Sequence, residues 1–354
     1  MAEPNARGGS ATRKIKWLAV AIVIVIGLYA GLWMFLASRL DRGAAQAMAQ
    51  AEAEGTRIEC AGRDVRGFPF RLGLFCERTG IALPDGTTAS AGELRSAAQI
   101  YDPGLVISEL DGPASVAAPG LTAEAAWDVL RASTNFGIER LNLGVARLEN
   151  VRLDGTLDGA PMGATLDRLV ASVRPNGPDL DAAITVDALD AAPIDGRDAP
   201  PIDLRVDATV SGAAGALAYD GVPVESLRGR TLTLRSFDLA FAGGGRLAAD
   251  GSVSVDGDGL ASGSVEIGFS DLPAMVDAVV AFAPDAAAPL RTVATVIDGG
   301  GGGGFLSGLV AGASGGTGAE DAAPDDGLAR VTIRLQSGEA RLGVIPLGSV
   351  PPLP

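Results

Sequence analysis

The residues of this chain that could do chemistry are two cysteines and many carboxylates, in a sequence without a single histidine. The absence of histidine removes imidazole metal ligands, Ser-His-Asp triads and imidazole acid–base catalysis together. The sequence therefore leaves thiol chemistry at Cys60 and Cys76, and carboxylate chemistry.

The two cysteines are separated by 16 positions. Catalytic thiol pairs usually have the spacing C-x-x-C, which lets one thiolate attack at short range. The wider spacing favours a structural disulfide over the alternative, a redox pair. A disulfide also requires an oxidising compartment, so the assignment depends on where this part of the chain resides.

The segment around the cysteines predicts a β-hairpin, with strands over residues 56–65 and 70–83. Alternation places Phe70 and Cys76 on one strand face, and we expect the cysteines to face each other across the hairpin. Glycine and proline interrupt strands and favour turns. The expected tip consists of Gly67, Phe68, Pro69, Phe70 and Arg71.

The carboxylates give the chain a net charge of −15, from 43 Asp and Glu against 28 Lys and Arg. Nearly all of them occupy alternating polar positions or turns, which indicates solvated faces. The sequence DGDG at 256–259 lacks the remaining ligands of a calcium loop and is interpreted as a hairpin turn. We therefore expect no metal, no cofactor and no enzymatic activity. The enzyme alternative is a glycan hydrolase with two carboxylates.

Residues 17–37 form a run of 21 residues without a charge. As a helix this run spans about 30 Å, the hydrocarbon thickness of a bilayer. Trp17 lies at one end and Tyr29 and Trp33 lie towards the other, where aromatic rings favour the membrane interface. We expect an uncleaved signal-anchor. The alternatives are a signal peptide cleaved at 44–47 and a buried core helix.

Basic residues flank this segment unequally. Four precede it and two closely follow it: Arg7, Arg13, Lys14 and Lys16 before, Arg39 and Arg42 after. The positive-inside rule then places the N-terminus in the cytoplasm and the body outside, where Cys60 and Cys76 can oxidise. Residues 1–42 carry +4, so the remainder carries −15 − 4 = −19. Such an acidic body argues against nucleic-acid binding.

The chain is therefore divided into four parts. We expect a basic cytoplasmic tail at 1–16, a transmembrane signal-anchor helix at 17–37, a helical stalk at 38–55 and a β-rich domain at 56–354. Within this domain, residues 298–327 are rich in glycine but lack a phosphate-loop motif. They are interpreted as a flexible loop.

Most of the body has the period-two alternation of antiparallel strands. Four residues of the segment 201–210 share one apolar side: Ile202, Leu204, Val206 and Val210. Similar runs occupy 231–241, 251–259, 263–270 and 329–347, separated by turn sequences. The fold class is mainly β: one transmembrane helix, then a large curved antiparallel sheet with a few short packed helices. We expect those helices at 121–133, 270–284 and 289–298.

An apolar sheet face has to be covered, and the expected strands offer more face than three helices hide. This imbalance points to a hydrophobic ligand. The proline-rich end, 342–354, is interpreted as an edge strand and a tail packed over the sheet, with docking to another envelope protein as the alternative.

Four features together resemble a known family: the N-terminal anchor, the segment C…GFPFRLGLFC, the later AAQIYDPGLVISELDGP and the closing GEARLGVIPLGSVPPLP. The family is the uncharacterised alphaproteobacterial envelope family called domain of unknown function 2125. The resemblance covers most of residues 15–354. It implies a location in the bacterial inner membrane with a periplasmic body, and it transfers no catalytic residue. The strand-rich layout is also similar to AsmA-like periplasmic groove proteins, a likeness of fold alone.

Two functions of different classes follow from these observations. The first is non-enzymatic binding or transfer of lipid, or of another hydrophobic ligand, on the apolar sheet face. The second is a structural or assembly factor that binds an envelope protein partner. In both cases the lipid bilayer holds the chain through its N-terminal helix.

Overall fold

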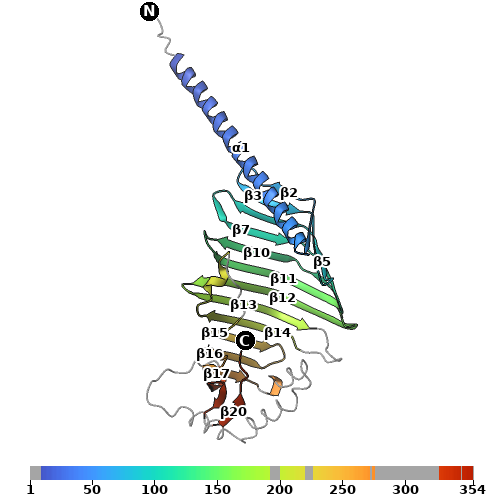
Figure 1. Cartoon of the computed structure of the whole chain (residues 1–354), viewed down its shortest axis with the longest axis vertical. Coiled ribbons are helices and arrows are strands. Elements are labelled where there is room, and N and C mark those ends of the chain that lie inside the picture. The colour runs from blue at the N-terminus through green and yellow to red at the C-terminus, as the bar shows by residue number, and fades with distance from the viewer. Residues whose placement is uncertain are drawn as a thin grey trace, which may run out of the picture.

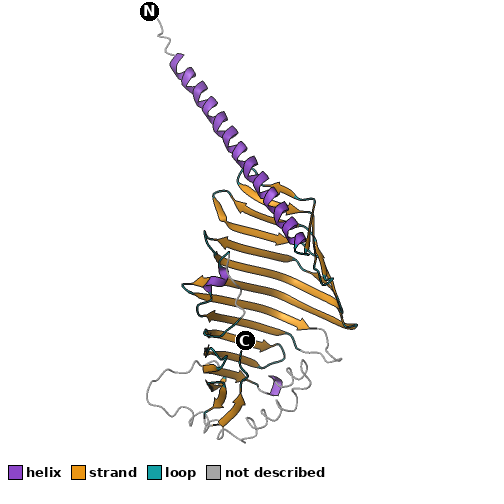
Figure 2. Cartoon of the chain, in the orientation of Figure 1, coloured by secondary structure: helices purple, strands orange, loops and turns teal. Residues whose placement is uncertain are grey.

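The computed structural model describes residues 9–191, 200–219, 226–271, 273–275, 327–343 and 345–353. Within them one long helix precedes a single large antiparallel sheet (Figure 1), and strands predominate over helices (Figure 2). The mainly β fold class, with one apolar N-terminal helix and few others, is confirmed.

Helix α1 (Gly9–Ala53) is continuous over 45 residues, about 67 Å. It includes the apolar run and residues 38–53 of the segment expected as a stalk. It is the one helix of the described chain that is long and apolar enough to cross a membrane. Its N-terminal half projects away from the sheet (Figure 1). After the last turn, Gly55 has a φ of 90° and the Thr56 N–H donates to the Ala51 carbonyl at 2.9 Å. A glycine is favoured there because other residues rarely adopt a positive φ.

The described strands are β1 (Arg57–Ala61), β2 (Asp64–Arg66), β3 (Arg71–Cys76), β4 (Arg78–Ala82), β5 (Thr88–Ala91), β6 (Leu94–Gln99), β7 (Asp102–Leu110), β8 (Ala114–Ala118), β9 (Leu121–Ala126), β10 (Val129–Phe136), β11 (Leu141–Leu157), β12 (Ala160–Asn176), β13 (Asp179–Ala191), β14 (Ile202–Val210), β15 (Thr231–Phe241), β16 (Arg246–Val255), β17 (Ala261–Ser270), β18 (Ala329–Gln336), β19 (Glu339–Leu342) and β20 (Ile345–Ser349).

The first ten strands behave as five long strands, each interrupted once. β2 pairs with β3 while β1 pairs with β4, and the same double pairing continues through β6/β5, β7/β8 and β10/β9. Both β10 and β9 then pair with the 17-residue β11, and β11 to β20 follow in chain order. The interruptions form a line across the sheet, here called the crease: residues 62–63, 77, 92–93, 111–113 and 127–128.

The crease shifts the alternation of side chains by one residue in most of the strands that it crosses. In β11 the less exposed positions include Ala146 and Leu148 before the crease and Val151 and Leu153 after it. The crease continues into β11 at Asn150, which lies between these positions, has a φ of 52° and donates from its side chain to the Asp128 carboxylate at 2.6 Å. Such irregularities bend a strand and re-aim its side chains. Because neighbouring strands shift together, one sheet face stays apolar on both sides of the crease.

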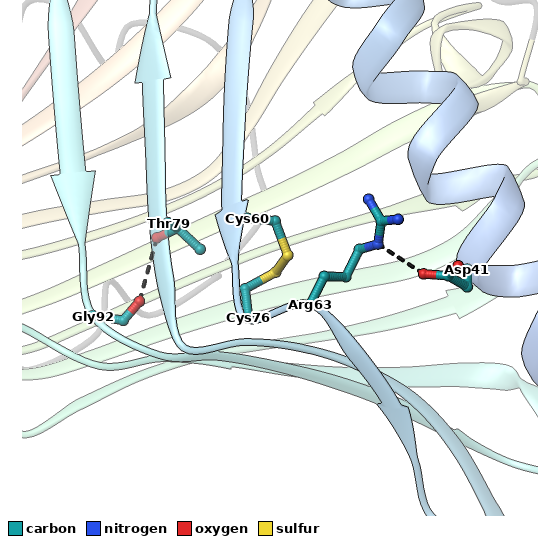
Figure 3. The surroundings of a disulfide bond; sticks show 6 residues. All are labelled: Asp41, Cys60, Arg63, Cys76, Thr79 and Gly92. Atoms are coloured by element: carbon teal, nitrogen blue, oxygen red, sulfur yellow. Dashed lines mark hydrogen bonds and ion pairs between the residues drawn. A yellow bond between two sulfur atoms is a disulfide. The ribbon is translucent and has the colours of Figure 1, made fainter.

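The predicted disulfide between Cys60 and Cys76 is confirmed and lies at the crease (Figure 3), with a Cα–Cα distance of 5.0 Å. The hairpin is present, but its cysteines are not directly opposite each other: the register places Cys60 opposite Thr79. The offset arises because the two strands are interrupted at residues 62–63 and at Glu77, whose N–H donates to the Ala61 carbonyl at 2.8 Å. Cys76 is only 2% exposed.

The helix expected at 121–133 is wrong: this segment forms β9 and the start of β10. Its alanines favour a helix, but pairing on both sides, with β8 and β11, overrides that preference. Within β9, the Thr122 hydroxyl shares a 2.8 Å hydrogen bond with the Thr156 hydroxyl on the neighbouring strand. Trp127 lies in the crease, and its indole N–H donates to the Leu110 carbonyl at 2.8 Å.

The expected helix at 270–284 begins in the described chain. Residues 273–275 are helical, and the Asp271 carboxylate accepts the Ala274 N–H at 3.2 Å. The rest of this segment, the expected helix at 289–298 and the glycine-rich loop up to residue 326 lie outside the described residues.

The polar sheet face is held by ion pairs, of which the most enclosed involves Asp181. This carboxylate is 4% exposed. It accepts hydrogen bonds from Arg235 at 2.9 Å, Thr209 at 2.7 Å and Arg174 at 3.2 Å, and so joins four adjacent strands. Arg235 first, then Thr209 and Arg174, lower the pKa of Asp181 to about 2, against the opposing effect of desolvation.

We predict that Asp181→Asn destabilises the body at neutral pH. A carboxyl whose pKa falls from 3.8 to about 2 on folding stabilises the fold above pH 3.8, and that contribution is lost as the pH falls through about 2. We expect the variant to lose about 2 kcal/mol of the free energy of unfolding at pH 7, and the loss to become smaller as the pH falls to 2. The measurement is urea denaturation in detergent at both pH values. Asp258→Asn, in an exposed turn, is the control. An Asp181→Asn deficit that is the same at both pH values would contradict the assignment.

We predict that the double variant Cys60→Ser/Cys76→Ser lowers the free energy of unfolding by about 3 kcal/mol, because the bond restricts the unfolded chain. The measurement is urea denaturation of the oxidised wild type, the reduced wild type and the variant. Reduction should reproduce the effect of the variant. Equal stability of all three samples would show that the bond has no structural role.

Candidate functional site

The apolar sheet face carries a row of large side chains that crosses the sheet from β6 to β17. In each pair of neighbouring strands the register places one member of the row opposite the next. Between β7 and β10 the last paired residues are Glu109 and Arg131, and the next positions in the same register are Leu110 and Leu130. We call this row the leucine ladder: Leu94, Leu110, Leu130, Leu148, Leu169, Val186, Leu204, Leu239, Leu247 and Phe269. Cys76 lies opposite Leu94 and begins the row.

The four residues predicted for an apolar sheet face lie on this side of β14. Leu204 belongs to the ladder, Val206 lies opposite Ile184 and Phe237, and Val210 lies opposite Leu180 and Leu232. Ile202 lies opposite Leu189 and Phe241. The register of β15 is irregular between Leu234 and Phe237. Because of this irregularity, the apolar residues of β15 on both sides of it lie on the same sheet face as the apolar residues of β14.

The ladder is only partly covered within the described residues. Val186 and Phe269 are 6% and 8% exposed, while its other members from Leu94 to Leu247 are intermediate in exposure. The helices of the described chain are α1, the short 3-10 helix η1 (Ala214–Leu217) and the helical residues 273–275. Helix α1 contacts mainly β1, β2 and β3, at one end of the sheet. A single sheet layer therefore presents a long apolar surface.

The ladder begins at a pocket between the C-terminal part of α1 and the sheet. The pocket has a volume of about 490 Å³. Ala44 and Met48, one helical turn apart, line it from α1. Its sheet side includes the disulfide and apolar side chains, among them Ile58, Leu74, Ile81, Leu94 and Leu110. This lining suits a hydrocarbon chain better than a polar ligand.

The hairpin tip lies against the aromatic residues of α1 that were predicted to mark the membrane interface. The Tyr29 hydroxyl donates to the Pro69 carbonyl, and the Trp33 indole N–H donates to the Arg71 carbonyl at 2.9 Å. The Phe68 ring lies 5.6 Å from the Trp33 ring, edge to face, and 6.3 Å from the Tyr29 ring. The structure thus joins the predicted hairpin tip to two of the aromatic residues predicted for the membrane interface.

An ion pair closer to the crease also joins the hairpin to the helix: Arg63 contacts Asp41 at 2.7 Å (Figure 3). Trp17, the third predicted interface aromatic, lies far along α1 and is 68% exposed. It is not part of the contact with the hairpin.

The opposite sheet face is polar. It holds a larger hollow of about 740 Å³, lined by charged and hydroxyl side chains that include Arg57, Glu59, Ser90, Ser115 and Glu124. Glu124 lies opposite Asp154 across β9 and β11, but both are exposed. Within the described residues no group of three or more Cys, Asp or Glu side chains is arranged to hold a metal ion. The apolar face is therefore the stronger candidate site.

The C-terminal tail returns to the sheet. The Val350 N–H donates to the Gly338 carbonyl at 2.7 Å, and the Leu353 N–H donates to the Gly259 carbonyl at 2.8 Å. Gly259 belongs to the DGDG turn, where the Asp256 carboxylate accepts the N–H groups of Asp258 and Leu260. That sequence is a hairpin turn between β16 and β17.

Sequence reasoning missed the pocket, the ladder and the contact between tip and helix. The spacing of Ala44 and Met48 on one helix face was the available signal for the pocket. The ladder has no signal within any single strand, because its members are brought together only by register.

No curated protein and no solved structure matches the chain. A family model described as an uncharacterized protein conserved in bacteria, DUF2125, matches residues 33–351 and so covers the hairpin, the crease and nearly the whole sheet. The chain belongs to the DUF2125 family.

Proposed function

We propose that this chain is a single-pass inner-membrane protein whose periplasmic sheet binds lipid, or another hydrophobic ligand, without catalysing a reaction. The observation that carries the proposal is the partly uncovered leucine ladder, which begins at an apolar pocket beside the membrane helix. A ligand chain lying on the ladder would remove apolar surface from water on both partners.

The mechanism is passive. Each buried methylene contributes about 0.8 kcal/mol to the free energy of binding. Contact of an acyl chain with a few residues of the ladder is therefore enough for binding without a charged anchor. The polar face keeps its ion pairs, such as Arg131 with Glu109 and Arg246 with Asp238, and stays in water. Binding therefore involves one face of the sheet only.

The periplasmic placement is supported by two independent features. The basic flank before the apolar segment favours a cytoplasmic N-terminus. The Cys60–Cys76 bond is the chemistry expected in an oxidising compartment. In a sheet anchored in this way, the pocket lies beside the helix that crosses the bilayer. The lipids of that bilayer are a source of acyl chains.

We predict that lipid co-purifies with the full chain in mild detergent and that Leu204→Gln lowers the amount severalfold, because it places a polar group on the ladder. Arg205→Gln, the next residue on the opposite face, is the matched control and should leave lipid content unchanged. The measurement is mass spectrometry of extracted lipid per mole of protein, with circular dichroism to verify folding.

Two outcomes would contradict the proposal. The first is equal lipid content in both variants. The second is a wild-type chain that carries no lipid, or that carries one dominant envelope protein instead, which is the result expected of an assembly factor.

A further inference from the structure

The tip of the β2–β3 hairpin is fixed at a definite level along α1. The Tyr29 hydroxyl and the Trp33 indole both donate to backbone carbonyls of the tip, at Pro69 and Arg71. Both aromatic residues lie inside the uncharged run 17–37. Along a helix, Trp33 is about 6 Å and Tyr29 about 12 Å from the end of that run at Ala37. The tip therefore lies beside the apolar part of the helix, about 6 to 12 Å before the C-terminal end of that part.

Aromatic side chains at this level are exposed over more than half of their surface. Phe68 is 53% exposed, Phe70 is 66% exposed, and Tyr101 on the next turn is 77% exposed. The two turns are joined directly, since the Ile100 N–H donates to the Phe70 carbonyl at 3.0 Å. Three exposed rings on adjoining turns form a surface that water solvates poorly, whereas aromatic rings concentrate at the level of lipid headgroups.

Basic residues flank the tip on both sides. Arg66 ends β2 and Arg71 begins β3, and both are exposed. Arg66 contacts Asp64 at 2.7 Å, while its guanidinium lies 5.3 Å from the centre of the Phe75 ring. Arginine side chains at the edge of an apolar surface reach lipid phosphates. Apolar rings at the tip with arginines behind them match the layering of a bilayer interface.

We propose that residues 67–71 and Tyr101 insert into the interface of the bilayer that α1 crosses, and give the sheet a second membrane contact. The occupant of this surface is the bilayer itself. A helix alone would let the sheet rotate about the helix axis, whereas a second contact beside it fixes one orientation. The inference rests on membrane anchorage by α1, and it does not depend on lipid binding by the ladder.

The experiment uses single cysteines labelled with an environment-sensitive fluorophore in the full chain, reconstituted in phosphatidylcholine–phosphatidylglycerol nanodiscs. Both native cysteines are bonded to each other, so the introduced thiol alone reacts. Phe70→Cys and Tyr101→Cys probe the tip at two positions. Ile24→Cys, 55% exposed on α1, probes the anchor. Leu157→Cys, 51% exposed at the C-terminal end of β11, probes the sheet at the strand ends away from the tip.

We expect lipids carrying a nitroxide near the headgroup to quench both tip probes at least twofold, and to leave the Leu157 probe unchanged. The Ile24 probe should be quenched most by a nitroxide deep in the acyl chain. Tip probes that behave like Leu157 while Ile24 is quenched would overturn the inference alone. An unquenched Ile24 probe would overturn both the inference and the membrane anchorage on which it rests.

Discussion

A single layer of strands has two faces, and the alternation of this sequence makes one of them apolar. In most folds a second layer covers such a face. Here the described chain supplies one long helix, whose main contacts are with β1, β2 and β3, while the leucine ladder continues to β17. Apolar surface of this extent has to be removed from water, and this requirement determines what the sheet can bind.

The crease, the disulfide and the helix contacts act together on that face. The crease bends the sheet but keeps its apolar side continuous, as Leu148 and Leu153 show on either side of Asn150. The Cys60–Cys76 bond fixes the point where the first long strands bend and where the ladder begins. Arg63, Phe68 and Pro69 then hold the hairpin on α1, so the apolar face begins beside the membrane segment.

The sequence predicted what depends on local pattern. The alternation at Ile202, Leu204 and Val206 correctly indicated an antiparallel sheet, and the spacing of the two cysteines indicated a structural bond. The helix predicted at 121–133 was wrong. The alanine-rich composition of this segment favours a helix, but two neighbouring strands supply its hydrogen bonds. The ladder and the crease could not be predicted, because both exist only once register aligns residues from different strands.

The most direct test of this account asks what touches the ladder in the cell. A photoreactive benzoylphenylalanine in place of Leu169, at the middle of the ladder, reports its neighbours when irradiated in intact bacteria. If the apolar face binds lipid, the chain acquires acyl-chain adducts that mass spectrometry detects on the peptide containing residue 169. If the dominant product instead joins this peptide to the segment 276–326 of the same chain, the protein covers its own face and the account is contradicted.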